Sequence, residues 1–238
     1  MTICIAALAE DKKKIILAAD QMITATIPIA YEFETEDVRK IYFPTENIAI
    51  LTAGNTLHAF EIVDQLIRDI RSDANVKPEH RRTEYVVERT RKIYQDYRRN
   101  LFSKTFLEPR GLNLNSYYDI QQKLFPGVVN KIEHELDSFS IGVEMIVAGS
   151  NPGGNCHIYS ITHPGISTSH DELGYVAVGS GAAHAMYYLI GSGYKKTFPA
   201  KRVEQVVREA KKRSEAAPGV GQETTIITLP KKNRRKLN

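Results

Sequence analysis

Thr2 is the residue whose type and position offer the most chemistry in this chain. A hydroxyl is a poor nucleophile unless a base takes its proton. If Met1 is removed, as is usual when a small residue follows, Thr2 carries both the hydroxyl and a free α-amine that can act as this base. An α-amine has an ordinary pKa of about 7.7 to 8.0, so a modest lowering of that pKa makes it neutral near pH 7. We therefore take Thr2 as the candidate nucleophile.

The other reactive side chains have simpler interpretations. Cys4 lies two residues beyond Thr2 on the same strand face, and we expect it to be a small core residue. The second cysteine, Cys156, lies far along the chain, so neither a zinc site nor a disulfide framework is indicated. We expect no metal and no cofactor. Three histidines lack partners at ligand spacing and are expected to be packing or surface residues, namely His58, His157 and His184.

The composition is typical of one compact domain. Of the 238 residues, 42% are hydrophobic and 25% are charged, which is sufficient for a substantial core. The net charge of +4 arises from the last eight residues, and we interpret 231–238 as a solvated basic tail without function. No segment approaches the length of a membrane-spanning helix. We expect a soluble cytoplasmic protein that binds neither nucleic acid nor membrane.

The N-terminal part is predicted to consist of strands. Apolar runs at 2–9 and 15–19 flank a charged turn, which indicates a buried hairpin that would hold residue 2 at a rigid strand edge. A third strand is predicted around 40–43, a turn at 44–47 and a fourth strand over 48–53.

The middle of the chain is predicted to be helical. Asn55 is a plausible N-cap for a helix over 56–72. A second helix follows, then a loop over about 103–113, then helical stretches interrupted at Pro126-Gly127. The inward faces of the first two helices are expected from their spacing to be Phe60, Val63, Ile67 and Ile70, and Val86, Thr90, Ile93 and Tyr97.

The C-terminal part returns to strands at 140–148, 157–162 and 175–178, with the glycine-rich segment 149–155 as a turn. Helices over 180–190 and 200–213 and a strand over 224–229 follow. Strands, helices, strands, helices and strand build two packed sheets, because each sheet needs one face on its partner and one under helices. We predict an α+β fold, a four-layer αββα sandwich, as a single domain over 1–230 with an extended helical middle at about 76–138.

Five motifs resemble those of proteasome β subunits and of the bacterial heat-shock proteasome-like peptidase, which are N-terminal-nucleophile (Ntn) hydrolases. Each motif alone is common in other folds, but here their order and spacing agree together. The resemblance covers about 2–72 and 140–229, whereas the helical middle is longer than in the family. The motifs are Ile16-Leu-Ala-Ala-Asp20, Lys40-Ile-Tyr-Phe43, Leu51-Thr-Ala-Gly54, Val147-Ala-Gly149 and Val178-Gly-Ser-Gly181.

The resemblance implies a proton-transfer arrangement around Thr2. Lys40 matches the family lysine, and its charge would lower the pKa of the Thr2 amine, while Asp20 would orient Lys40. The backbone N–H of Gly54 would donate to the oxyanion, and Ser180 would hydrogen-bond the amine or a nearby water. Singly, each of these residues has an ordinary structural interpretation, but their shared order favours the functional one.

One stretch departs from the family pattern. The family carries an aspartate and, three residues on, a serine before the last glycine-rich turn, whereas this chain reads Ser214-Glu-Ala-Ala-Pro-Gly-Val-Gly. Glu215 lies one residue late and is a possible substitute for the aspartate. Ala217 lacks the hydroxyl.

The resemblance thus implies a threonine-type peptidase or amidohydrolase, which cleaves peptide bonds of a peptide or protein substrate through an acyl-enzyme on Thr2. It also implies a ring or other homo-oligomer. One alternative passes the acyl group to an amine, giving a transpeptidase or a specialised amidase. Another is a catalytically silent structural subunit of a proteasome-like assembly. Silent subunits usually carry an N-terminal helical extension, and here only Met1 precedes Thr2.

Overall fold

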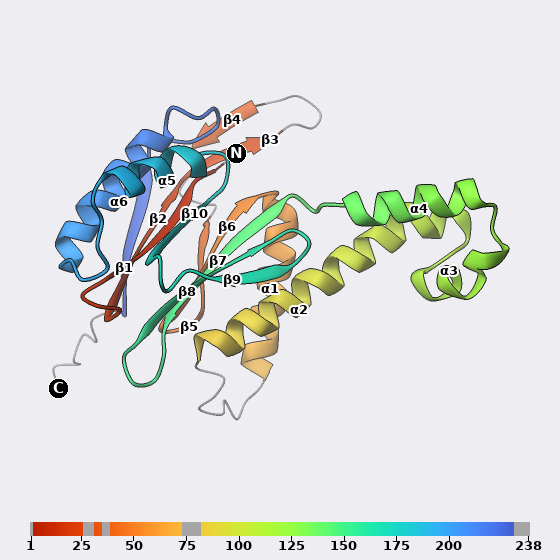
Figure 1. The fold of residues 1–238 in the computed structure, drawn as a ribbon, viewed down its shortest axis with the longest axis horizontal. Coiled ribbons are helices and arrows are strands. Elements are labelled where there is room, and N and C mark those ends of the chain that lie inside the picture. Colours follow the sequence, from red (N-terminus) through yellow and green to blue (C-terminus); the bar gives the residue numbers. More distant parts are fainter. Residues whose placement is uncertain (1, 26–30, 35–38, 73–81, 231–238) are drawn as a thin grey trace.

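The computed structural model describes residues 2–25, 31–34, 39–72 and 82–230. The fold is mixed α/β with antiparallel sheets (Figure 1). The tail at 231–238, Met1 and the start of the expected helical middle lie outside the described residues. The strands are β1 (Cys4–Ala9), β2 (Lys14–Asp20), β3 (Met22–Ala25), β4 (Tyr31–Glu34), β5 (Ile41–Thr45), β6 (Ile48–Gly54), β7 (Val143–Ser150), β8 (Cys156–Thr162), β9 (Ile166–Ser169), β10 (Tyr175–Val178) and β11 (Thr224–Leu229).

The strands form one sheet with the order β10-β1-β2-β11, a second with the order β5-β6-β7-β8-β9, and a ribbon of β3 and β4. The predicted N-terminal hairpin is confirmed as β1 and β2, with Cys4 opposite Ala19. β11 lies on the other side of β2 with Thr224 opposite Asp20. This register brings the start of β1, the end of β2 and the start of β11 to one end of the sheet.

The two larger sheets face one another across a shared core. The largest cluster of buried side chains includes Leu17 and Val178 from the first sheet and Leu51 and Ile146 from the second. Strand β1 is buried along its whole length because its alternate side chains enter two different clusters. The continuous apolar run of β1, without polar alternation, is the sequence signal for this double burial.

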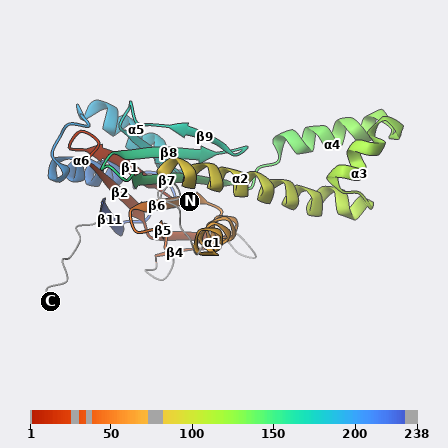
Figure 2. The same ribbon diagram turned by 90° about the horizontal axis from the view of Figure 1, so that it is seen from below.

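Helices cover the outer faces of both sheets (Figures 1 and 2). α5 (Ala182–Gly191) and α6 (Ala200–Ser214) pack on the first sheet, where Leu189 and Val207 belong to the same buried cluster as Ile5. α1 (Thr56–Ser72) and α2 (Thr83–Phe102) pack on the second sheet. Asn55 caps α1 as predicted, because its Oδ1 accepts hydrogen bonds from the backbone N–H groups of Leu57 and His58.

A long helical hairpin projects beyond the sheets (Figure 1). It consists of the end of α2, a π-helical turn η2 (Ser103–Leu107), 3-10 turns η3 (Glu108–Arg110) and η4 (Gln121–Lys123), α3 (Leu114–Ile120) and α4 (Pro126–Ser138). Its small core contains Phe102, Leu107, Tyr117 and Ile132, and the half-buried Phe139 packs against both this core and the one under α1 and α2. The hairpin thus has a small core of its own beside the two-sheet body.

Several sequence predictions of individual elements need correction. The expected turn at 44–47 begins later, because β5 includes Pro44 and lies at a sheet edge, where a missing N–H is tolerated. The short strands β3, β4 and β9 were not predicted. The expected loop over 103–113 is helical as far as Arg110. Phe60 was expected to face inward but is 52% exposed, since Ala59, Ile62 and Leu66 form the buried face of α1.

Within the described ranges, 2–25, 31–34, 39–72 and 82–230, no helix is long and apolar enough to cross a membrane.

Candidate functional site

Thr2 lies two residues before β1 and is 4% exposed. Its backbone N donates to Ser180 Oγ at 3.2 Å, and Ser180 Oγ in turn lies 3.4 Å from Thr2 O. The N–H of Gly181 also donates to Thr2 O, at 3.4 Å. Ser180 follows β10, which pairs with β1, so the sheet brings together two residues 178 positions apart. The predicted association of Thr2 with Ser180 is present.

Asp20 lies at the end of β2 and is 1% exposed. Each of its two carboxylate oxygens accepts two hydrogen bonds. Oδ1 accepts from the Ile3 N–H at 3.0 Å and from Lys40 Nζ at 2.8 Å. Oδ2 accepts from the Met22 N–H at 3.2 Å and from the Gly221 N–H at 3.0 Å. Four donors match the acceptor capacity of an ionised carboxylate. Asp20 thus joins the first strand, the lysine and the last turn.

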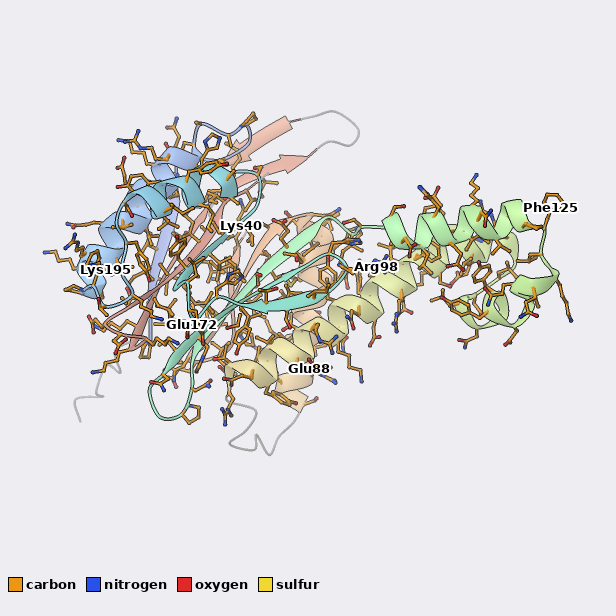
Figure 3. All side chains as sticks on the ribbon, in the orientation of Figure 1. Lys40, Glu88, Arg98, Phe125, Glu172 and Lys195 are labelled. Carbon is orange, nitrogen blue, oxygen red and sulfur yellow. The ribbon has the colours of Figure 1, made fainter. Side chains whose placement is uncertain are left out.

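Lys40 is 7% exposed and lies just before β5 rather than within it. Its ammonium donates to Asp20 Oδ1 and, at 2.6 Å, to Met22 O. Its carbonyl accepts from the Thr52 N–H on β6 at 3.0 Å. Because Lys40 and the Ile3 N–H share one oxygen of Asp20, the ammonium lies beside the start of β1. Figure 3 labels Lys40 within the two-sheet body, away from the projecting hairpin.

Gly54 ends β6 with φ +91°, in the left-handed region that favours glycine. A Cβ at this position would lie 2.0 Å from Gly142 O, so the backbone approach also requires glycine. The turn after β10 connects this region to Thr2: a Cβ at Gly179 would lie 2.2 Å from Thr2 O and 3.3 Å from Ala53 Cβ. Gly54 follows Ala53 in the chain, so it lies in the same region as Thr2. Among the described residues, no hydrogen bond joins Gly54 to Thr2.

Glu144 is a site residue that sequence reasoning missed. Its Oε2 accepts from the Gly179 N–H at 2.7 Å and so holds the turn that carries Ser180. The signal in the sequence is a carboxylate among the apolar residues at the start of β7. That signal does not say which backbone group the carboxylate would meet.

Glu215, the residue considered as a substitute in the departing stretch, binds a different lysine from Lys40. Its Oε1 accepts from Lys211 Nζ at 2.7 Å rather than from Thr2 or Lys40. Ala217 is buried in the cluster between the first sheet and α6, where a hydroxyl would need a partner. The position of Ser214 is also informative, since a Cβ at Gly181 would lie 2.9 Å from Ser214 Cβ. Ser214 thus packs behind the Ser180 turn.

The thiol of Cys4 lies in this region but is shielded. Cys4 is fully buried, as predicted, and its Sγ donates to Thr52 O at 3.4 Å. Burial raises the pKa of the Cys4 thiol well above its usual range, and the charge of Lys40 offsets only part of that effect. Cys4 is consequently a poor nucleophile despite its position two residues from Thr2.

A pocket of about 300 Å³ lies next to the Asp20–Lys40 pair. Arg39, Gln21 and Thr225 contribute polar groups to its wall, and Phe43 and Ile227 contribute apolar ones. No cluster of three or more potential metal-ligating side chains occurs in the described part of the chain. His157, which was expected to be a packing or surface residue, contacts Asp171 through Nδ1 at 2.6 Å.

The sequence matches no protein-family model, and no curated protein is similar to it at a significant level.

Proposed function

We propose that this protein is a threonine-type Ntn hydrolase of the proteasome-like kind, which cleaves amide bonds of a peptide or protein through Thr2 once Met1 has been removed. The observation that carries the proposal is the position of the buried Asp20–Lys40 ion pair, 2.8 Å long, whose carboxylate binds the N–H of Ile3, the residue next to Thr2. The contact of Thr2 N with Ser180 supports it.

The arrangement of layers also supports the αββα sandwich that the resemblance implies. Two antiparallel sheets share a core, α5 and α6 cover one, and α1 and α2 cover the other. In such a fold the open end between the sheets would admit an extended peptide. The long helical hairpin is an addition to that arrangement.

In the proposed reaction the Thr2 hydroxyl attacks the carbonyl carbon of the substrate amide and passes its proton to the Thr2 α-amine. Lys40 keeps that amine neutral near pH 7, because a nearby positive charge lowers the pKa of an amine. The Gly54 N–H donates to the oxyanion of the tetrahedral intermediate. The C–N bond then breaks, the leaving amine takes the proton, and water releases the acyl group from the Thr2 oxygen.

Ser180 has a specific part in this reaction. Its hydroxyl already accepts from Thr2 N and approaches Thr2 O. After loss of Met1 the same nitrogen would be the amine, and Ser180 would orient it toward the hydroxyl. Glu144 would support Ser180 by holding the Gly179 N–H.

The test is intact mass spectrometry before and after treatment with a peptide epoxyketone, which adds to both the hydroxyl and the amine of an N-terminal threonine. We expect loss of Met1 and addition of one probe. Thr2→Val keeps the β-branched shape but lacks the hydroxyl, so this variant should take no probe. A wild-type chain that retains Met1, or that loses it and takes no probe, contradicts the proposal.

The fate of the acyl group needs a second measurement. Product analysis of a cleaved peptide with and without an added amine separates hydrolysis from transpeptidation. We expect the free acid as the main product in both cases. An amide product that depends on the added amine would instead support the transpeptidase alternative.

We further propose a homo-oligomer. Large apolar side chains are exposed on the outer helices, including Leu57 at 78% on α1 and Tyr187 at 76% and Ile190 at 64% on α5. Exposed apolar side chains on outer faces suit contacts between copies. Sedimentation equilibrium should give a mass several times that of one chain, and a monomer at micromolar concentration would contradict this part of the proposal.

A further inference from the structure

Lys211 is a buried cation with no direct part in the proposed reaction. It lies in the last turn of α6 and is 2% exposed. Its ammonium donates to Glu215 Oε1 and to Gly221 O, both at 2.7 Å, and to Gln222 O. Three acceptors match the three hydrogens of the ammonium, which is the condition under which a buried charge is tolerated. The ammonium of Lys211 is thus surrounded by protein acceptors in place of water.

All three acceptors of Lys211 belong to the segment 215–222, which connects α6 to β11. This segment is also fixed from the inside, because Ala217 and Val220 are buried against the first sheet and α6. Its Gly221 is held at both of its polar groups, since the carbonyl accepts from Lys211 and the N–H donates to Asp20 Oδ2 at 3.0 Å. A path of two hydrogen bonds therefore runs from Lys211 to Asp20.

We infer that Lys211 is a positioning residue for the candidate site, acting through Gly221 on Asp20 and thereby on Lys40. This inference rests on the proposed function. The segment that Lys211 fixes is the one in which the family aspartate and serine are missing, and the internal cation orders it by a different means. The charged groups around the start of β1 are Asp20 from β2, Lys40 and, through Gly179, Glu144 from β7.

The inference predicts a specific chemical effect of removing the ammonium. Without it, the carbonyls of Gly221 and Gln222 lose their buried donor, the segment relaxes, and the N–H of Gly221 no longer holds Asp20. Lys40 is then less firmly placed beside Thr2 and lowers the pKa of the α-amine less. The acidic limb of the pH–rate profile, which reports that amine, should move to higher pH.

The experiment compares the rate of epoxyketone labelling as a function of pH in the full chain and in Lys211→Met. We expect labelling at pH 7 to slow by roughly 10- to 100-fold, the range expected when a reacting group is slightly misplaced. Lys212→Met is the matched control, because Lys212 is the exposed neighbour on the same helix. It should label like wild type. Lys211→Arg retains the charge and the donors and should recover part of the rate.

The outcomes separate this inference from the proposed function. A wild-type protein that takes no label contradicts the proposed function itself. A labelled wild type together with a Lys211→Met variant of equal rate and equal pH profile overturns only the role of Lys211. If Lys211→Met does not fold, amide exchange of the wild type decides: the Gly221 amide should exchange as slowly as the β1 amides, and exchange at the rate of an exposed turn overturns the inference.

Discussion

At the scale of single residues, the buried pair of Asp20 and Lys40 is the feature with the largest expected effect on stability. Both side chains are at most 6% exposed. Lys40→Met should lower the free energy of unfolding by about 3 to 5 kcal/mol, because it leaves the Asp20 carboxylate buried without its cation. Urea unfolding at pH 7 measures this change.

Two further variants make the Lys40 prediction specific. Lys12→Met removes a surface cation whose partner Glu172 is 93% exposed, and it should leave stability nearly unchanged. Adding Asp20→Asn to Lys40→Met should restore part of the lost stability, since the uncompensated charge is gone. The result to compare is the effect of Asp20→Asn in the wild type. If Asp20→Asn lowers the free energy of unfolding of Lys40→Met by as much as it lowers that of the wild type, the two groups are not coupled.

The two cysteines give a second prediction at this scale. Burial raises the pKa of Cys156 to about 11 and raises that of Cys4 still further. A raised pKa leaves little thiolate at pH 8, so the native protein should react very slowly with iodoacetamide. The protein in urea should take up two equivalents, as counted by mass spectrometry.

Fast alkylation of one thiol in the native protein would contradict this cysteine prediction. It would mean that β1 or β8 opens readily. The prediction also matters for the test of Thr2, because inert thiols leave the added mass of an electrophile assignable to the threonine.

At the scale of elements, the end of β6 depends on Gly54. Gly54→Ala should be destabilising for two reasons, the positive φ and the contact of the new Cβ with Gly142 O. Gly153→Ala is the matched control, since Gly153 has φ +110° but nothing within 4 Å of its added Cβ. We expect Gly54→Ala to cost about 1 to 3 kcal/mol more than Gly153→Ala, the range for overpacking. Urea midpoints of the two variants provide the comparison, and equal midpoints would show that the Gly142 contact relaxes freely.

At the scale of the whole molecule, the projecting hairpin should be separable from the body. In Figure 3 Phe125 lies at the far end of the hairpin and Arg98 near its base. The ring centroids of Phe102 and Phe139 are 5.6 Å apart, so the two ends of the hairpin approach each other there and a short linker is expected to replace 104–137. The truncated protein should unfold cooperatively with a Tm lowered by no more than about 5 °C, because the two-sheet cores lose few contacts.

Circular dichroism and calorimetry together measure this outcome. The helical signal should fall with the deleted helices while a single unfolding transition persists. Loss of the cooperative transition would show that the hairpin core is needed by the sheets. The native oligomeric state of the truncated protein then reports whether the hairpin takes part in contacts between copies.

Much of the element order follows from the sequence because it depends on local patterns. The continuous apolar runs predict β1 and β2, the helical spacing after Asn55 predicts α1, and the last strand is predicted over the residues that form β11. The short strand β9 was missed because Ile166–Ser169 has only one apolar residue, and its strand conformation depends on pairing with β8. The inward face of α1 was displaced by one residue because periodicity alone does not fix how a helix is rotated on a sheet.

By itself, the sequence indicated the candidate residues and the elements that carry them. It placed Thr2 at the first buried strand, Asp20 at the end of the next, and Lys40 and Gly54 at the two ends of the later strand pair that forms β5 and β6. Only the tertiary structure decided their partners. Thr2 meets Ser180 across 178 positions and Asp20 meets Gly221 across 201, because β10 and β11 insert beside β1 and β2 in the sheet. The same is true of Glu144, whose donor is the Gly179 N–H 35 positions away on the other sheet. Lys211 binds acceptors close to it in sequence, but Gly221 reaches Asp20 only through the folded sheet.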